Sequence, residues 1–322
     1  MWLRQVLLSS RILLCSSFSL LAVLIGILLT ASASAQTQAS CQFVKFNTRF
    51  FINIDSGYRV LFPQGINDNG TVVGDANDSV DFTDRGFTRL ANGNITYYRL
   101  KGQDGAPLHT FFGDRNNNGV TVGIAGGMFA PGYRNGTPFT LHNSVATPLK
   151  MTIAGTTYNK FTVRGNNRWG STVGSYVDSS GKVHGFKRLS DGKAIALDFP
   201  GAAQTDAFAI NDNGAIVGYY SKTASPNLWR HGFIYHNGQW AKLNYPSSIL
   251  QTELTGISDS NLIIGTTIKG SNAMGSFMYK NGMFKKIVMP NSNVPTYAHG
   301  VSPGNNLITG SSGYKGFIAT CK

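Results

Sequence analysis

A short phrase returns six times along this chain: a small polar turn, three mostly apolar residues and a closing glycine. The two cleanest copies are residues 67–74, Asn-Asp-Asn-Gly-Thr-Val-Val-Gly, and 211–218, Asn-Asp-Asn-Gly-Ala-Ile-Val-Gly. The closing glycines are 49, 51, 44, 47 and 45 residues apart, at Gly74, Gly123, Gly174, Gly218, Gly265 and Gly310. This spacing is typical of a four-stranded propeller blade rather than of a helical repeat.

Each repeat carries two turn signals with apolar runs on both sides. In the first repeat these are Asn69-Gly70 and Asn92-Gly93, with Gly86-Phe87 between them. Such pairs predict tight type I′ turns, which need a positive φ at both central residues. Val, Ile, Thr, Phe and Tyr dominate the runs, and no helical spacing persists over three turns after residue 35. The sequence therefore predicts an all-β chain, a six-bladed β-propeller of four-stranded antiparallel blades.

The repeated phrase resembles the bacterial extracellular HAF repeats, in which a His-Ala-Phe tripeptide follows a Gly-Ile-Asn-Asn/Asp-x-Gly-x-x-x-Gly phrase. Residues 65–74 and 209–218 match the phrase, and His184-Gly185-Phe186 and His231-Gly232-Phe233 stand where the tripeptide belongs. The chain departs from the family in having Gly for Ala, and in lacking the His in its other four copies. The resemblance implies secretion and a β-propeller-like array, and it brings no activity with it.

Residues 1–35 have the pattern of a secretory signal peptide. Arg4 and Arg11 come before or beside an apolar stretch, residues 12–29, and Ala33-Ser34-Ala35 forms a cleavage box. An uncleaved membrane anchor is the alternative, because the stretch is long enough to span. We expect removal of the segment, a single domain over 36–322 that is secreted or periplasmic, and no stable membrane insertion afterwards.

The remaining chain holds two cysteines, Cys41 and Cys321, one near each end. An exported pair with no third thiol predicts a disulfide. The sixth repeat stops after its third strand, residues 315–320, whereas residues 42–46 form a spare strand ahead of the first repeat. We expect this N-terminal strand to complete the last blade, so that the ring is closed by the strand and by the terminal disulfide.

The chain is basic, with 28 Lys and Arg against 15 Asp and Glu. Without the two arginines of the first 35 residues its net charge is +11. A charge of this size favours polyanions, and an exported protein rarely meets nucleic acid. The expected partner is an extracellular polysaccharide or another polyanion; the alternative is a charged surface that only keeps a monomer soluble.

The sequence contains no H-E-x-x-H, G-x-S-x-G, P-loop, C-x-x-C or S-x-x-K motif. Its single glutamate, Glu253, means that paired catalytic carboxylates would come from aspartates. A weak metal candidate is the acidic segment with Asp75, Asp78, Asp81 and Asp84, which lacks the Gly and Glu of an EF-hand loop. We expect no cofactor. His184 and His231 recur at one repeat position, which favours a structural hydrogen bond between strands.

Strand direction alternates, so the loops after the second and fourth strands of each repeat share one face. These loops vary most in length, and variable loops commonly carry function. Aromatic and cationic residues gather there, suited to stacking on sugars or holding anionic groups; the candidate binding residues are Trp229, Tyr219, Tyr220, Arg230, His231, Tyr176 and Tyr297. The alternative is that these aromatic rings cover blade edges.

The leading interpretation is an exported propeller that acts as a binding or surface-interaction module, with extracellular acidic polysaccharide as the candidate ligand. One rival is a propeller-fold glycan lyase or hydrolase with its site in the central funnel; another is a structural cell-envelope protein. An enzyme would need isolated, non-repeating Asp, His, Arg or Tyr residues that converge at the funnel.

Overall fold

The computed structural model describes residues 37–51, 58–78, 84–126, 136–224 and 229–322. The expected signal peptide and Asp81 lie outside the described residues. Throughout the described ranges the chain forms strands and turns, and none of it forms a helix long and apolar enough to cross a membrane.

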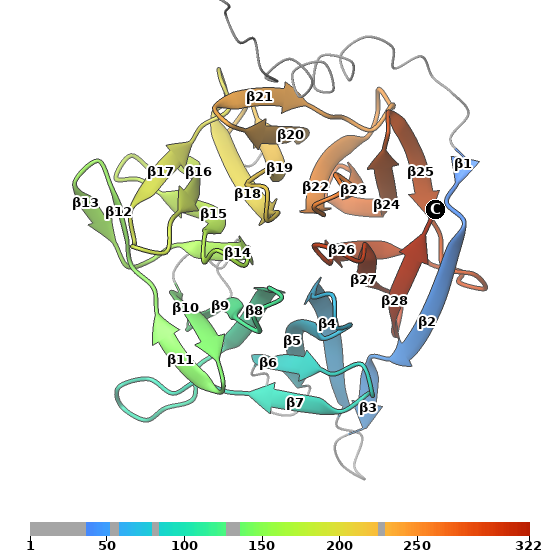
Figure 1. The fold of residues 1–322 in the computed structure, drawn as a ribbon, viewed down its shortest axis with the longest axis horizontal. Coiled ribbons are helices and arrows are strands. Elements are labelled where there is room, and N and C mark those ends of the chain that lie inside the picture. The colour runs from blue at the N-terminus through green and yellow to red at the C-terminus, as the bar shows by residue number, and fades with distance from the viewer. Residues whose placement is uncertain (1–36, 52–57, 79–83, 127–135, 225–228) are drawn as a thin grey trace, which may run out of the picture. The chain divides into compact units, whose positions relative to one another are not determined.

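Six antiparallel blades surround a common centre (Figure 1). Five blades follow the chain order, with the first strand innermost; blade 1 contains β4 (Tyr58–Ile66), β5 (Val72–Asp78), β6 (Asp84–Arg89) and β7 (Ile95–Tyr98). Blade 2 contains β8 (Thr110–Arg115), β9 (Thr121–Ala125), β10 (Thr137–His142) and β11 (Val145–Pro148). Blade 3 contains β14 (Thr162–Asn166), β15 (Thr172–Val177), β16 (Val183–Arg188) and β17 (Ala194–Leu197).

Blade 4 contains β18 (Gln204–Ile210), β19 (Ile216–Ser221), β20 (His231–His236) and β21 (Gln239–Lys242). Blade 5 contains β22 (Gln251–Ile257), β23 (Ile263–Lys269), β24 (Asn272–Lys280) and β25 (Met283–Ile287). Blade 6 contains β26 (Tyr297–Val301), β27 (Leu307–Ser312), β28 (Lys315–Cys321) and the N-terminal β2 (Cys41–Asn47). The predicted six-bladed propeller is confirmed.

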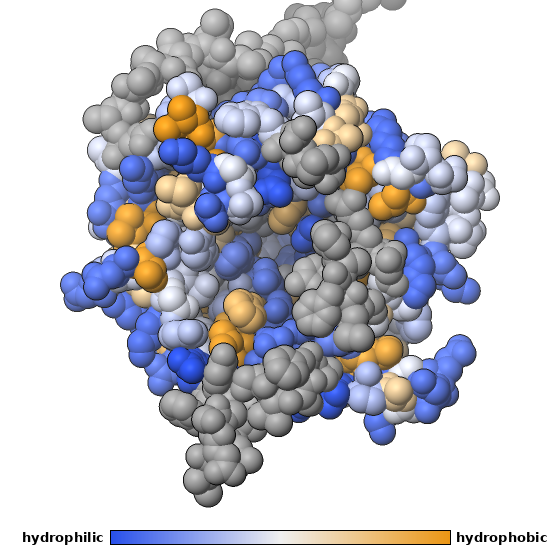
Figure 2. Space-filling view, turned by 180° about the vertical axis from the view of Figure 1, so that it is seen from behind, coloured by the Kyte–Doolittle hydropathy of each residue, from blue (hydrophilic) through white to orange (hydrophobic). Residues whose placement is uncertain are grey.

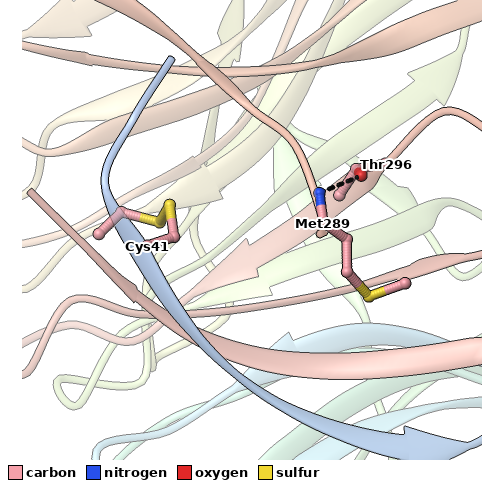
Figure 3. Close-up of a disulfide and its surroundings, with 4 residues drawn as sticks. Cys41, Met289 and Thr296 are labelled. Carbon is pink, nitrogen blue, oxygen red and sulfur yellow. Dashed lines mark hydrogen bonds between the residues drawn. A yellow bond between two sulfur atoms is a disulfide. The ribbon is translucent and has the colours of Figure 1, made fainter. Parts of the chain in front are cut away.

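The last blade is completed by the N-terminal strand, as the repeat phase predicts. β2 pairs antiparallel with β28 from Cys41 opposite Cys321 to Asn47 opposite Lys315. The two cysteines form a disulfide with an S–S distance of 2.04 Å (Figure 3). Phe43 packs edge-on against Phe317, with ring centroids 5.2 Å apart. Covalent, hydrogen-bonded and apolar contacts thus all hold the ring closed.

Three smaller additions do not follow from the repeat. β1 (Thr37–Gln38) adds to the outer edge of blade 5, parallel to β25. β3 (Arg49–Phe51) pairs with the start of β4. A hairpin of β12 (Met151–Ile153) and β13 (Thr156–Tyr158) occupies the connection between blades 2 and 3.

The turns between the first and second strands differ from the predicted type I′ geometry. Within 67–70, only Gly70 has a positive φ (71°), and its N–H donates to the carbonyl of Asn67. This is a type I turn followed by one left-handed residue. In blades 5 and 6 the last residue of this turn is an asparagine, Asn261 or Asn306, and it has the positive φ that a glycine has in the other blades. The type I′ geometry does occur between the outer strands, for example at Asn237-Gly238.

The polar residues of these turns join neighbouring blades. Asn167 illustrates the pattern: its Oδ1 accepts from the backbone of Ser171 in its own turn, and its Nδ2 donates to the carbonyl of Asn211 in the next blade. Asn116 and Asn211 make the same pair of bonds. At the junction of blades 6 and 1, Asp68 accepts from the backbone of Gly304. The repeated Asn-Asp phrase therefore links the blades into a ring.

The closing glycine of each phrase is required by close backbone approach. A Cβ on Gly74 would overlap the carbonyl oxygen of Phe62 on the neighbouring innermost strand, and Gly174, Gly218 and Gly310 face equivalent carbonyls. The Phe of the Gly-Phe pair fills the blade core; Phe87, Phe186, Phe233 and Phe317 are fully buried, and so is Phe277, which follows a serine. The repeat signature is therefore mainly a packing signature.

Candidate functional site in the central channel

The six innermost strands enclose a cavity of about 650 Å³. They are β4, β8, β14, β18, β22 and β26, the strands nearest the centre of the ring (Figure 1). Figure 2 shows the molecule from behind, hollowed near its middle and bordered there by hydrophilic residues. The cavity has the size of a small-molecule site.

One bulge in each innermost strand supplies a residue to this channel. The pairing register slips by one residue in all six strands, and the skipped residue lines the cavity in every case. A bulged residue leaves the ladder and its side chain is re-aimed, a device found next to active sites. No two of the six are alike: Gln64, Gly113, Arg164, Phe208, Thr255 and His299.

Blade 1 contributes an acidic wall. Asp75 and Asp84 lie on the adjacent strands β5 and β6, and both line the cavity. Gln64 Nε2 lies 3.3 Å from Asp75 Oδ1, and Asn77 Nδ2 donates to Asp84 Oδ1 at 3.0 Å. His109 of the next connection places Nδ1 3.0 Å from Asp84 Oδ2. Burial, and secondly the negative charge of Asp84, raise the pKa of Asp75 to about 7.

A third carboxyl, that of Asp114, lies where neighbouring innermost strands come into close contact. The other blades have Gly or Ala at this place, and a Cβ on Gly65 would come 2.6 Å from Asp114 Cα. Asp114 accepts a hydrogen bond from the backbone of Arg115 at 2.8 Å, yet burial raises its pKa to about 7. His299, on blade 6, has its pKa lowered to about 4 by burial, so its ring is neutral at pH 7.

Blades 3 to 5 supply a network of opposite charges beside the channel. The Arg164 guanidinium donates to both oxygens of Asp206, at 3.3 and 3.2 Å. Arg230 Nε lies 3.1 Å from Glu253 Oε1. Tyr219 lies between the pairs, and burial, with the charges of Asp206 and Glu253, raises its pKa to about 12. The network is balanced in charge and rigid, which suits a role in positioning.

Aromatic rings accompany these polar groups. Phe62 and Phe111 take equivalent places on the innermost strands of blades 1 and 2, and both line the cavity. Phe62 is 44% exposed, unlike the fully buried phenylalanines of the blade cores. Phe208 lines the cavity beneath the guanidinium of Arg164, 4.2 Å from its ring centroid. The channel therefore combines apolar ring surface with amide, carboxyl and imidazole groups.

The candidate binding residues on the long-loop face divide into three groups. Tyr176 and Tyr220 are buried, and each packs on the histidine of its own repeat, Tyr176 on His184 and Tyr220 on His231. Phe199 also stacks on Tyr220, with centroids 3.7 Å apart. Their repeated place and burial indicate blade packing.

Tyr219 and Arg230 belong to the charge network beside the channel, so the structure brings them together. Trp229 remains 43% exposed at the rim. Tyr297 is half-buried and its hydroxyl donates to the carbonyl of Ala273 at 3.2 Å. His231 Nδ1 lies 3.3 Å from Asn244 Nδ2. The role of these residues in binding stays a prediction.

His184 makes hydrogen bonds of the kind expected for a structural residue at this repeat position. Its Nδ1 lies 2.9 Å from Asp198 Oδ1 at the end of β17, and its Nε2 lies 3.0 Å from Asp178 Oδ2 in the turn before β16. The histidine thus ties the third strand of its blade to its neighbours.

Only part of the weak metal candidate can be described: Asp75 and Asp84 have described side chains, Asp78 a described backbone, and Asp81 neither. Among the side chains that the structure describes, no three from His, Cys, Asp and Glu gather as a metal site would require. Asn77 and His109 hold Asp84 through hydrogen bonds instead.

The bulge residues were absent from the sequence-based candidates, which came from the variable loops. A signal was present in the repeat itself. The residue before the Gly-Ile-Asn part of the phrase differs in every copy, while the surrounding positions are kept. When the residue type changes at one position of a repeat whose other positions are kept, blade packing does not determine the residue at that position.

No family model matches the chain, and no curated protein matches it. The resemblance to the HAF repeats therefore stays an expectation. Among solved structures, the fold is similar to virginiamycin B lyase from Staphylococcus aureus, at 10% identity over 87% of this chain and 99% of that one, with a TM-score of 0.49.

It is also similar to a gluconolactonase from Xanthomonas campestris, at 13% identity over 90% and 98% of the two chains, with a TM-score of 0.49. A third similar structure is an arginine-to-alanine mutant of AofleA from Arthrobotrys oligospora, at 11% identity over 88% and 86%, with a TM-score of 0.47. Likeness at this level says nothing about a ligand or a reaction.

Proposed function

We propose that the protein is an exported binding module that holds a saccharide unit in its central channel. The observation that carries the proposal is the exposed ring of Phe62 in a cavity that combines apolar side chains with carboxyl and amide groups. Sugars present an apolar face and a rim of hydroxyls, and they are bound by an aromatic ring together with carboxyl and amide groups. Gln64, Asp75 and Asn77 lie on the same wall as Phe62.

The disulfide is compatible with an exported protein, because such bonds persist in oxidising compartments. We propose a secreted or periplasmic location on that basis, together with the secretory pattern of residues 1–35. The same proposal includes three further points. The protein is a monomer, residues 1–35 are cleaved from it, and it belongs to the HAF-repeat family.

The test is a glycan array with the exported protein, followed by calorimetric titration of the best ligand. Phe62→Ala should weaken binding about 10- to 100-fold, the loss expected when a stacking ring is removed from a hot spot. Trp169→Ala is the matched control, because Trp169 is 63% exposed and does not line the cavity. Unchanged affinity in Phe62→Ala would overturn the channel site.

Trp229→Ala distinguishes the channel from the long-loop face. If the ligand lies in the channel, this variant should bind like the unmodified protein. A loss confined to Trp229→Ala would move the site to the rim and would restore the earlier hypothesis of stacking by Trp229, Tyr219 and Tyr220.

A second candidate function is glycoside hydrolysis in the same channel. The observation in its favour is the different surroundings of the two carboxyls of blade 1: burial raises the pKa of Asp75 to about 7, and Asp84 is held by hydrogen bonds to Asn77 and His109. In hydrolysis Asp84 would take a proton from water as the water oxygen bonds to the anomeric carbon. Asp75 would give its proton to the departing glycosidic oxygen.

The hydrolase is tested with the oligosaccharide found on the array. Asp75→Asn should abolish release of reducing ends and leave binding within about threefold. Absence of any release by the unmodified protein, with binding intact, would exclude the hydrolase and leave the binding module standing.

A further inference from the structure

The positive charge of the chain is unevenly distributed. Residues 260–322 contain six lysines and neither Asp nor Glu, and residues 36–54 add Lys45 and Arg49 without an acidic residue. These two segments form most of blade 5 and all of blade 6. These two segments therefore contribute cations and no Asp or Glu, and the carboxylate of Asp68 from blade 1 contacts them at Gly304 and Asn305.

Four of the lysines follow the line where the N-terminal segment joins blades 5 and 6. Lys285 and Lys286 lie on β25 opposite Thr37 and Gln38 of β1, and as neighbours on a strand they leave it on opposite faces at the outer edge of blade 5. Lys45 lies on β2, and its Nζ donates to the carbonyl of Pro290 at 2.9 Å. Lys315 lies opposite Asn47 at the end of β2 and donates to its Oδ1 at 2.6 Å. We call Lys45, Lys285, Lys286 and Lys315 the lysine seam.

The seam lysines remain available to an anion. Lys45, Lys286 and Lys315 are exposed and Lys285 is half-buried. The ion pairs found among the described residues involve none of the four. Their positive charges are therefore balanced by solvent ions, which a polyanion would displace with a gain in entropy.

Apolar surface accompanies the seam. Tyr314 precedes Lys315 and is 56% exposed, with the guanidinium of Arg49 4.9 Å from its ring centroid. Val44, next to Lys45, is 65% exposed. An exposed ring beside ammonium groups fits the face and the carboxylate of an acidic sugar.

We propose that the lysine seam is a docking surface for an acidic polysaccharide, with Tyr314 as its aromatic contact. The seam is extended along the outer strands, and the seven residues of β2 alone span about 20 Å at about 3.3 Å per residue. Each exposed ammonium contributes little by itself, so a useful affinity needs several regularly spaced anions. A uronate polymer provides such a row. Lysine presents a point charge and lacks the bidentate fork of arginine that phosphate recognition commonly uses.

The surface lies on the outer strands and is independent of the channel and of the proposed function. The experiment measures retention of the exported protein on immobilised polygalacturonate and on neutral dextran across a salt series. The unmodified protein should be retained on polygalacturonate at low salt, should elute as salt rises, and should pass dextran freely. Phe62→Ala should not alter this behaviour.

The decisive variant is Lys45→Gln, Lys285→Gln, Lys286→Gln and Lys315→Gln combined. Its matched control carries Lys101→Gln, Lys150→Gln, Lys160→Gln and Lys193→Gln, which remove the same charge from exposed lysines elsewhere. The seam variant should lose about tenfold or more in affinity, and the control less than about threefold, with equal melting temperatures. Equal losses in both variants would overturn the seam and leave only an effect of net charge.

Tyr314→Ala separates a sugar from a simple polyanion. It should weaken polygalacturonate binding and leave binding of inorganic polyphosphate unchanged. If polyphosphate binds as tightly as polygalacturonate, and Tyr314→Ala alters neither, the assignment to polysaccharide is wrong.

Discussion

Arg164 in blade 3 and Asp206 in blade 4 form a two-point ion pair across the blade junction, with Nη2 3.2 Å from Oδ2. The Asp206 side chain is only 2% exposed, so its charge depends on this partner for compensation. Neither residue belongs to the repeated phrase. The pair thus distinguishes this junction from the repeated hydrogen bonds that the turn asparagines make between blades.

Arg164→Ala should lower the free energy of unfolding by about 2–3 kcal/mol, because it leaves a buried carboxylate uncompensated. Urea unfolding at pH 7 measures the change. Lys193→Ala is the control, since its pair with Asp191 is exposed and should contribute less than about 0.5 kcal/mol. A loss in Arg164→Ala no larger than the control would show that water already compensates Asp206.

Replacing both cysteines by serine should destabilise the ring by about 5 kcal/mol in the chain-entropy treatment, because the closed loop spans 280 residues. Hydrogen exchange gives a sharper test than melting alone. Exchange should accelerate in β2 and β28, and the amides of blade 3 should keep their protection. Uniform acceleration in all blades would show that the ring opens as one unit.

The raised pKa values of Asp75 and Asp114 predict an unusual pH dependence. Between their unfolded values near 3.8 and their folded values of about 7, the folded state binds more protons than the unfolded state. Their contribution to stability therefore falls as pH rises through this window and is constant above it. His299 acts oppositely, because its lowered pKa makes stability fall as pH drops from about 6.5 to about 4.

Asp75→Asn should consequently raise the free energy of unfolding at pH 8 and leave it nearly unchanged at pH 4. Denaturant unfolding of the variant and the unmodified protein at both pH values isolates the contribution of Asp75 from that of His299. Equal effects at the two pH values would mean that the carboxyl is not desolvated in the folded protein.

The effect of Asp68 on stability should have the opposite pH dependence to that of Asp75. It accepts hydrogen bonds from the backbones of Gly304 and Asn305 at 2.9 and 2.8 Å and from Asn117, and these bonds lower its pKa despite partial burial. Its stabilisation is present above its unfolded pKa and is lost as pH falls through the lowered value. Asp68→Ala should cost about 2 kcal/mol at pH 7 and less at pH 2, as measured by thermal unfolding. A cost that is the same at both pH values would remove the electrostatic explanation.

The fold was predictable because its determinants are local and repeated. Three features recur in the chain, and each marks one place in a blade. They are a turn glycine with positive φ, a closing glycine packed against a backbone carbonyl, and a phenylalanine in the blade core. The incomplete sixth repeat and the terminal cysteines then determined how the ring closes. The type I′ prediction for the inner turns was wrong because the left-handed residue follows a type I turn there, which Asn-Gly also permits.

The channel could not be found from loop lengths. Its residues come from the interior of strands, at a bulge that exposes no turn signal, and Gln64, Arg164 and His299 are far apart in sequence. Tyr176 and Tyr220 could have been recognised as packing residues, because they occupy one repeat position and face the repeated histidines. Asp114 could be recognised only from the structure, which shows that it occupies a repeat position where the other blades have Gly or Ala.

The pairing of β2 with β28 also imposes an order on folding. The strand that is made first along this chain has its partner in the strand that is made last, so the last blade cannot be completed until β28 has been synthesised. Until the two strands of one molecule pair, each is complementary to the partner strand of a neighbouring copy. Strand exchange between two copies would preserve the same pairing, and a disulfide between Cys41 of one molecule and Cys321 of another would make that exchange permanent.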